Sequence, residues 1–204
     1  MVRHIHRNDI GYLFTNARFN IKQTENIVEM VEILGKYMFL DRNLLEKKSK
    51  NGIGLSYLEK AAEKDIIVQM RDETKTKMND IFYFQLGIGG KFLLQYMGKD
   101  FHDLILSSGR REKSNILTFN IFADKKGYDI SMRYQQDKDY NYFICENNII
   151  CYMPNYISDK EVAEKLIVNQ IKNLSFKKVY ENYNYIPIDI KPLIIGSRTK
   201  NVIL

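Results

Sequence analysis

Lysines and small polar residues gather around one predicted helix, over residues 53–64. They are Lys47, Lys48, Lys50, Asn51, Ser56, Tyr57 and Lys60. A lysine side chain binds phosphate oxygens as a point charge, whereas asparagine and serine side chains can hydrogen-bond to base edges. This combination at the start and on the exposed side of one helix predicts contact with double-stranded DNA.

Two more lysines, Lys75 and Lys77, lie in a charged segment between the apolar runs 66–71 and 81–86. The two runs predict an antiparallel hairpin, whose long polar tip would bring these lysines to the DNA backbone. Glu59 and Glu63 lie on the same predicted helix and would repel phosphate if they faced it. The open alternative is that the same fold makes protein contacts.

A thinly basic arm, residues 1–25, precedes these elements. Its basic residues are Arg3, His4, His6, Arg7 and Arg18. Such an arm can enter a minor groove, but it can equally be a disordered or packing extension. His4 and His6 would share one face of a strand, yet a zinc site needs three or four ligands. The remaining histidine is His102, so we expect no metal and no cofactor.

Residues 87–90, Gly-Ile-Gly-Gly, follow one predicted strand and precede a helix. A phosphate-binding loop would continue with Lys and then Ser or Thr, and a dinucleotide-binding loop would place its third glycine elsewhere. Neither pattern is present. The glycines predict instead that the following helix packs closely against the hairpin.

The carboxylates of the second half do not predict an active site. They are Asp124, Asp129, Asp137, Asp139 and Glu146, scattered through predicted strands and turns. A metal-dependent nuclease usually presents an acid on one strand and an acid-x-Lys on the next, and that order is missing. His102 has no evident nucleophile beside it in the sequence. We therefore expect a protein that is not an enzyme.

Hydrophobic spacing predicts the elements that position the lysines. A helix is expected from near Thr24 to Met38, a short helix capped by Asp41, and the helix over 53–64. The hairpin and a fourth helix, which ends at Gly98, complete a winged helix-turn-helix over residues 26–108.

The second half predicts a small α+β domain over residues 114–204, joined by a charged linker at 109–113. Antiparallel strands are expected at 116–122, 129–134, 142–145 and 149–153, with a two-residue turn at Asn147-Asn148. A capping box at Ser158 predicts a helix to about residue 172, then a strand at 176–180 and an irregular tail.

Composition sets broad limits on the partner and the compartment. Lys and Arg outnumber Asp and Glu by 31 to 25, a mild basic excess that suits a polyanionic partner. The two cysteines, Cys145 and Cys151, lie in apolar runs and make no disulfide framework. No apolar run is long enough to cross a membrane, and the N-terminus lacks the apolar region of a signal peptide. These features favour a cytoplasmic protein that does not contact membranes.

Two segments carry a resemblance to a known family. They are Gly-Ile-Gly-Leu-Ser-Tyr-Leu-Glu-Lys-Ala-Ala-Glu-Lys-Asp-Ile-Ile (52–67) and Phe-Tyr-Phe-Gln-Leu-Gly-Ile-Gly-Gly-Lys-Phe-Leu (82–93). Together with Phe101-His102-Asp103-Leu104, they resemble the winged-helix segment of replication-relaxation-type proteins of bacterial plasmids and phages. The resemblance covers about residues 26–106 and implies a role in plasmid replication, transfer or its regulation. It carries over no catalytic residue, because the acidic positions of that family's nuclease-like domain have no match here.

The sequence therefore predicts a sequence-specific double-stranded DNA-binding protein, a plasmid- or phage-encoded regulator of replication, transfer or transcription. The aromatic strands of the second half, with tyrosines such as Tyr140 and Tyr142, favour burial in a core or a homodimer interface over base stacking. The alternative is an adaptor or inhibitor from a mobile element that uses the winged helix for protein contacts.

Overall fold

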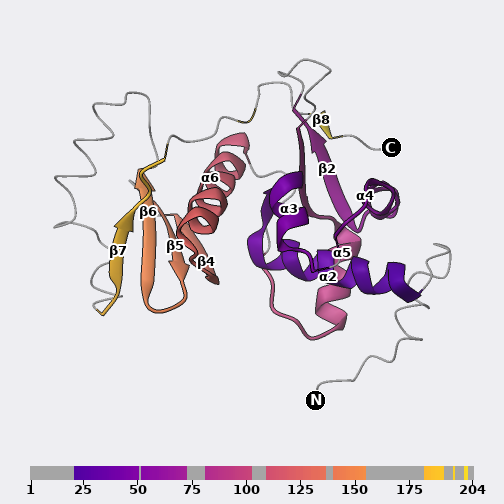
Figure 1. Cartoon of the computed structure of the whole chain (residues 1–204), viewed down its shortest axis with the longest axis horizontal. Helices are drawn as coiled ribbons and strands as arrows, with labels where there is room; N and C mark the ends of the chain where they lie inside the picture. Colours follow the sequence, from indigo (N-terminus) through magenta and orange to yellow (C-terminus); the bar gives the residue numbers. More distant parts are fainter. Residues whose placement is uncertain are drawn as a thin grey trace. The chain divides into compact units, whose positions relative to one another are not determined.

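The computed structural model has a mixed α+β fold, as the sequence predicts (Figure 1). It describes residues 21–50, 52–72, 81–102, 109–136, 140–154, 182–190, 195 and 200–201. Those residues form five helices and two four-stranded sheets. The chain divides into two compact units, residues 1–117 with 194–204, and residues 118–193.

Helices precede and follow a small antiparallel sheet in the first unit. Its elements are α2 (Ile21–Tyr37), β1 (Phe39–Asp41), α3 (Arg42–Lys48), α4 (Leu55–Glu63), β2 (Ile67–Arg71), β3 (Phe82–Leu86), α5 (Ile88–Tyr96) and β8 (Lys200–Asn201). The sheet order is β1-β3-β2-β8. The predicted hairpin is confirmed, with Ile67 opposite Leu86 and Arg71 opposite Phe82.

Strand β1 was missing from the sequence prediction, which extended the first helix through Met38. Met38 instead adopts a left-handed backbone with φ of 62°, so the chain turns there and Leu40 pairs with Phe84. The prediction that Asp41 caps the next helix is confirmed, because its carboxylate accepts a hydrogen bond from the Leu44 amide at 2.8 Å. Strand and helix therefore meet at this residue.

The core of the first unit forms where α2 lies against α3, α5 and β3 (Figure 1). Ile27, Val31 and Leu34 of α2 are fully buried, as their helical spacing predicts. α2 begins three residues before the predicted Thr24, so the boundary expected at residues 25/26 falls inside a helix. Helix α4 is shorter than the predicted 53–64, and Leu58 and Ala61 are buried on its inward side.

The close packing predicted for the glycines at 87–90 is confirmed. The amide of Gly87 donates to the Ile66 carbonyl and that of Gly89 to the Asp65 carbonyl, both at 2.9 Å. A Cβ on Gly87 or Gly90 would overlap one of these carbonyl oxygens. At the other end of α5, Gly98 has φ of 64° and closes the helix as predicted, with the Lys99 amide bonded to the Leu94 carbonyl.

The predicted linker at 109–113 and the predicted strand at 116–122 are both wrong. One helix, α6 (Arg110–Lys126), covers both segments. The run Ile116 to Phe122 is rich in β-branched and aromatic residues, which favours strand on local propensity. Burial decides otherwise: Ile116, Phe119 and Ala123 recur at helical spacing and are almost completely buried.

The second unit contains a sheet of order β4-β5-β6-β7. Its strands are β4 (Ile130–Gln136), β5 (Tyr140–Cys145), β6 (Ile149–Pro154) and β7 (Asn184–Pro187). The first three match predicted strands. The turn between β5 and β6 contains three residues, 146–148, one more than predicted, and Asn147 and Asn148 in it have positive φ of 58° and 55°. The sequence predicted an irregular tail at residues 184–187, and this prediction is wrong because these residues form β7. Strand β7 pairs parallel with β6, whereas antiparallel strands were predicted.

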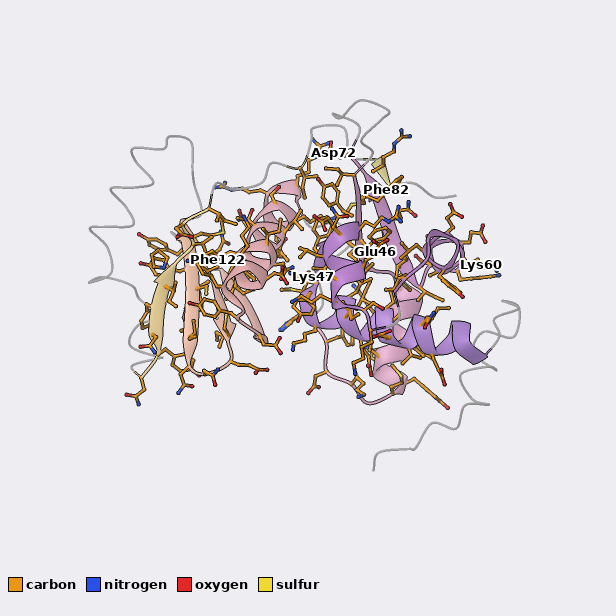
Figure 2. All side chains as sticks on the ribbon, in the orientation of Figure 1. Glu46, Lys47, Lys60, Asp72, Phe82 and Phe122 are labelled. Carbon is orange, nitrogen blue, oxygen red and sulfur yellow. The ribbon has the colours of Figure 1, made fainter. Side chains whose placement is uncertain are left out.

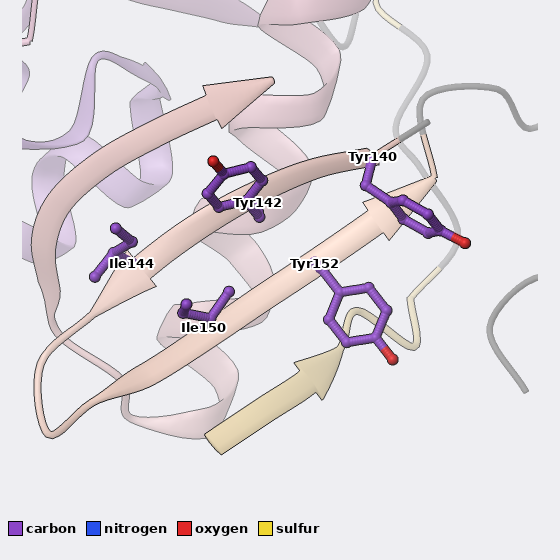
Figure 3. Packing of buried hydrophobic residues seen from close by; sticks show 5 residues of the cluster. All are labelled: Tyr140, Tyr142, Ile144, Ile150 and Tyr152. Atoms are coloured by element: carbon purple, nitrogen blue, oxygen red, sulfur yellow. The ribbon is translucent and has the colours of Figure 1, made fainter. Parts of the chain in front are cut away.

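Both faces of this sheet carry buried side chains. On one face, the rings of Phe119 from α6 and Phe143 stack with centroids 3.9 Å apart. The other face carries a tyrosine-rich cluster on the β5–β6 hairpin (Figure 3). Its buried members are Tyr140, Tyr142, Ile144, Ile150 and Tyr152, with Tyr183 and Tyr185 packed against them. These aromatic side chains form a core, one of the two roles expected for them.

Several predictions fall outside the described residues. They concern the arm at residues 1–20, Asn51, the hairpin tip with Lys75 and Lys77, the helix at 158–172 and the strand at 176–180.

Replacing Gly90 by Ala should destabilise the first unit by about 1–3 kcal/mol, because the new methyl group meets the Ile66 carbonyl oxygen. This cost exceeds the gain of about 1 kcal/mol that Ala brings over Gly in a helix. Urea unfolding followed by circular dichroism measures the difference. Gly109→Ala is the control, since nothing lies within 4 Å of a Cβ there. Equal stability of the two variants would contradict the close approach.

Candidate nucleic-acid interface

Glu29 of α2 fixes the turn between α3 and α4, where the predicted DNA-binding lysines begin. Its carboxylate accepts hydrogen bonds from the Ser49 hydroxyl at 3.2 Å and from the Lys50 amide at 2.7 Å. Both donors belong to the turn that leads into α4. A residue on the first helix therefore determines where Lys50 lies, a contact that no sequence pattern indicated.

A basic cluster lies around Tyr37 at the end of α2. The ammonium groups of Lys36 and Lys48 approach the tyrosine ring, with their nitrogens 5.6 and 5.1 Å from its centroid. Lys47 is exposed next to Lys48 on α3. Lysines from two helices thus share one surface region, and cation–π contact holds two of them over the ring. Lys36 and Tyr37 were not among the predicted site residues.

Helix α4 has a mixed charge on its exposed side. Lys60 extends away from the helix (Figure 2), and Glu59 and Glu63 are exposed as well. With 3.6 residues per turn, position 63 falls about 20° from position 56 and about 60° from position 60 around the helix axis, on the same side of α4. The acid that would oppose phosphate therefore lies on the face predicted to read DNA.

The first turn of α4 has no side-chain cap. Gly54 is the N-cap residue and, as a glycine, offers no side chain to cap the helix. Of the first amides, that of Tyr57 donates to the Gly54 carbonyl at 3.0 Å. Free amides at a helix N-terminus carry partial positive charge and can bind an anion, and Lys50 lies four residues upstream of this end.

The structure brings together only part of the predicted set. Lys47, Lys50 and Lys60 are exposed, and Lys48 and Tyr57 are half-buried. Ser56 lies in the first turn of α4, although its side chain is outside what the structure describes. Asn51, Lys75 and Lys77 are also outside it. The described residues therefore bear on the turn and on α4, and not on the hairpin tip.

A second group of polar residues, at the sheet of the first unit, is buried. The Tyr83 hydroxyl donates to the Asp72 carboxylate at 3.3 Å, and burial together with this carboxylate raises the pKa of Tyr83 well above its usual range. The Lys113 ammonium lies 3.5 Å from the Met70 sulfur, and burial lowers the pKa of Lys113. Their burial favours a structural role over contact with a large ligand.

The two cysteines are free thiols inside the second unit. Their sulfurs lie 3.8 Å apart on neighbouring strands. The hydrogen bond from Cys151 lowers the pKa of Cys145, and donating it raises the pKa of Cys151. Among the residues that the structure describes, no three His, Cys, Asp or Glu side chains gather as metal ligands would.

Comparison of the chain with known protein families, with curated proteins and with solved structures finds no match. The resemblance to replication-relaxation-type proteins therefore stays a prediction from the residues quoted above. Within the described part of the chain, no helix is long and apolar enough to span a membrane.

Replacing Lys113 by Met should stabilise the protein at neutral pH, and the gain should disappear in alkaline solution. Burial lowers the pKa of Lys113 in the folded state, so unfolding takes up a proton between the lowered and the usual pKa. The stability of the wild type therefore rises with pH through that window, and Met removes this rise. Urea unfolding at a series of pH values measures it.

The exposed Lys125→Met substitution is the control and should leave the pH profile unchanged. The lowered pKa would be contradicted if the stability difference between Lys113→Met and wild type stayed constant across the pH range in which lysine side chains lose their proton.

Proposed function

We propose that residues 21–102 form a winged helix-turn-helix that binds double-stranded DNA, with α4 entering the major groove. The element order α2-β1-α3-α4-β2-β3 and the sheet order β1-β3-β2 support this proposal. Three helices followed by a hairpin can present the third helix at the surface of the domain. The observation that carries the proposal is the run of lysines from the end of α3 (Lys47, Lys48) to Lys50 in the turn before α4, where Glu29 holds the turn.

The phosphate contacts come from the end of α3 and from this turn. Lys47, Lys48 and Lys50 supply positive charge, and the uncapped amides of α4 add hydrogen-bond donors that suit a phosphate oxygen. Glu29 acts as a positioning residue, because it holds the backbone of Lys50 without contacting DNA. Lys75 and Lys77 in the hairpin tip contact the neighbouring backbone.

Base contacts come from the turn before α4 and from α4 itself, in which Lys60 lies in the last turn. Asn51, Ser56, Tyr57 and Lys60 are the candidates, because their side chains can donate or accept hydrogen bonds at base edges. Glu59 and Glu63 oppose deep insertion of the helix along its whole length. The helix therefore enters the groove end-on, with its first turn nearest the bases.

The biological role that fits this activity is regulation of replication, transfer or transcription on a plasmid or phage, in the cytoplasm and without an enzymatic step. The resemblance of residues 26–106 to replication-relaxation-type proteins supports it. A homodimer would match a DNA site with two-fold symmetry.

One group of observations favours the alternative, a protein-interaction adaptor. The exposed face of α4 carries Glu59 and Glu63, and α5 exposes Ile88 and Phe92 to solvent. Acidic and apolar surfaces suit a protein partner better than a phosphate backbone. Direct measurement of DNA binding separates the two functions.

The protein should bind short random-sequence duplexes, with an affinity that falls steeply between about 50 and 200 mM salt. Replacing Lys47 and Lys50 by Ala should lower the salt slope by about 2, one for each lost phosphate contact. Fluorescence anisotropy measures both. Glu29→Ala should weaken binding but leave the salt slope nearly unchanged, because it releases the turn without removing a cation.

The matched control removes two exposed lysines elsewhere, Lys99 and Lys125, and should leave binding almost unchanged. An equal loss in both double variants would mean unspecific attraction by net charge. Absence of binding to any duplex, including selected ones, would favour the adaptor.

Replacing Glu59 and Glu63 by Gln should tighten DNA binding by roughly threefold to tenfold, because it removes like charge near the phosphates. Asp100→Asn with Glu146→Gln changes net charge equally at exposed sites off α4 and is the control. If the α4 variant binds no better than the control, α4 does not face the DNA.

A further inference from the structure

Helix α5 exposes an apolar stripe. Ile88, Phe92 and Tyr96 are 63%, 55% and 40% exposed, and they are the exposed large hydrophobic residues of the part of the chain that the structure describes. They recur every four residues and so lie along one side of the helix. The opposite side of α5 is packed in the core through Leu93 and Leu94. The helix thus has two apolar sides, of which only one is covered.

The stripe is symmetric about Phe92. Ile88 precedes it by four residues and Tyr96 follows it by four. If two α5 helices pack antiparallel, a two-fold axis at Phe92 places Phe92 against Phe92 of the second copy. The same axis places Ile88 against the partner's Tyr96, so the stripe is complementary to itself, as a two-fold interface requires.

Charges at the two ends of α5 suit the same arrangement. Asp65 is exposed and lies against the first turn, where its carbonyl accepts the Gly89 amide at 2.9 Å. Lys99, just beyond the last turn, is exposed and pairs with Glu32 of α2 at 3.3 Å. Antiparallel pairing brings Asp65 of one copy toward Lys99 of the other, and it also aligns the helix dipoles favourably. Lys91 points about 100° away from Phe92 around the helix, outside the stripe.

We propose that α5 is the homodimer interface, in which the stripe Ile88–Phe92–Tyr96 packs antiparallel against the same stripe of a second copy. This goes beyond the proposed DNA binding and does not depend on it. The three side chains expose roughly 300 Å² in one copy, less than the 800 Å² or so per partner of a standard interface. The dimer is accordingly expected to be weak and to dissociate on dilution.

Sedimentation equilibrium on the full chain without DNA tests this dimer. The wild type should pass from monomer to dimer with rising concentration, and Phe92→Ala should raise the dissociation constant at least tenfold. Gln95→Ala, at an exposed position of the same helix beside the stripe, should leave it unchanged. A monomer at all concentrations, or a dimer insensitive to Phe92→Ala, overturns the proposal.

Cysteine cross-linking tests the antiparallel register. Under mild oxidation, at a concentration above the dissociation constant that loss of the ring raises, Phe92→Cys should form a disulfide between the two copies, because the two-fold axis passes through this position. Ile88→Cys and Tyr96→Cys should cross-link efficiently only when the two variants are mixed. Self-linking of Ile88→Cys as strong as the mixed reaction would overturn the antiparallel pairing. No cross-link at any of the three positions would mean that another segment or another protein covers the stripe.

Discussion

Backbone hydrogen bonds between the turn after α4 and the start of α5 fix the positions of these two helices relative to each other. The carbonyls of Asp65 and Ile66 accept the amides of Gly89 and Gly87, and glycines at 87 and 90 leave no side chain in the way. The contact joins the end of α4 to the first turn of α5. It therefore determines both which face of α4 meets solvent and which face of α5 stays uncovered. The DNA-binding proposal and the dimer proposal both depend on this junction.

The charges of α4 limit how it can meet DNA. A helix lying lengthwise in a major groove has phosphates on both sides, so Glu63, on the same face as Lys60, would lie close to one of them. Lys50 precedes the other end of α4 in the chain, where the first amides bear partial positive charge, and Lys47 and Lys48 end the preceding helix α3. Positive potential at one end and acidic residues at the other favour entry by the N-terminus. The contact of Glu29 with the Lys50 amide gives this end a fixed position.

Local patterns predicted most of the first unit, because its helices and hairpin each carry their own signal. Asp41 caps α3, Gly98 closes α5, and the two apolar runs form β2 and β3. Strand β1 could not be predicted in this way: it has three residues, and its identity comes from pairing with Phe84, more than forty positions away. The Glu29 and Tyr37 contacts likewise join separate helices. Such contacts depend on the fold, which the local sequence does not encode.

Helix α6 is an element for which local residue propensity predicts the wrong secondary structure. Its β-branched and aromatic residues favour a strand locally, but a strand places alternate residues on opposite faces. Residues 113–120 are all buried, without the alternation of a strand that has one exposed face. The rings of Phe119 and Phe143 stack with centroids 3.9 Å apart, a contact between separate elements that local propensity does not encode. Tertiary packing therefore decides this element.

The tyrosines of the second unit are less suited to a dimer interface than the exposed side chains of α5. Their number in the C-terminal strands suggested a dimer surface, but Tyr140, Tyr142 and Tyr152 are almost completely buried in their own sheet. A ring that is already buried gains little from a second copy, because association removes almost no further apolar area from water. Phe92 and Tyr96 still expose about half of their surface. Burial of the exposed side chains of α5 can therefore stabilise a dimer, whereas the side chains of the tyrosine cluster are already buried within one chain.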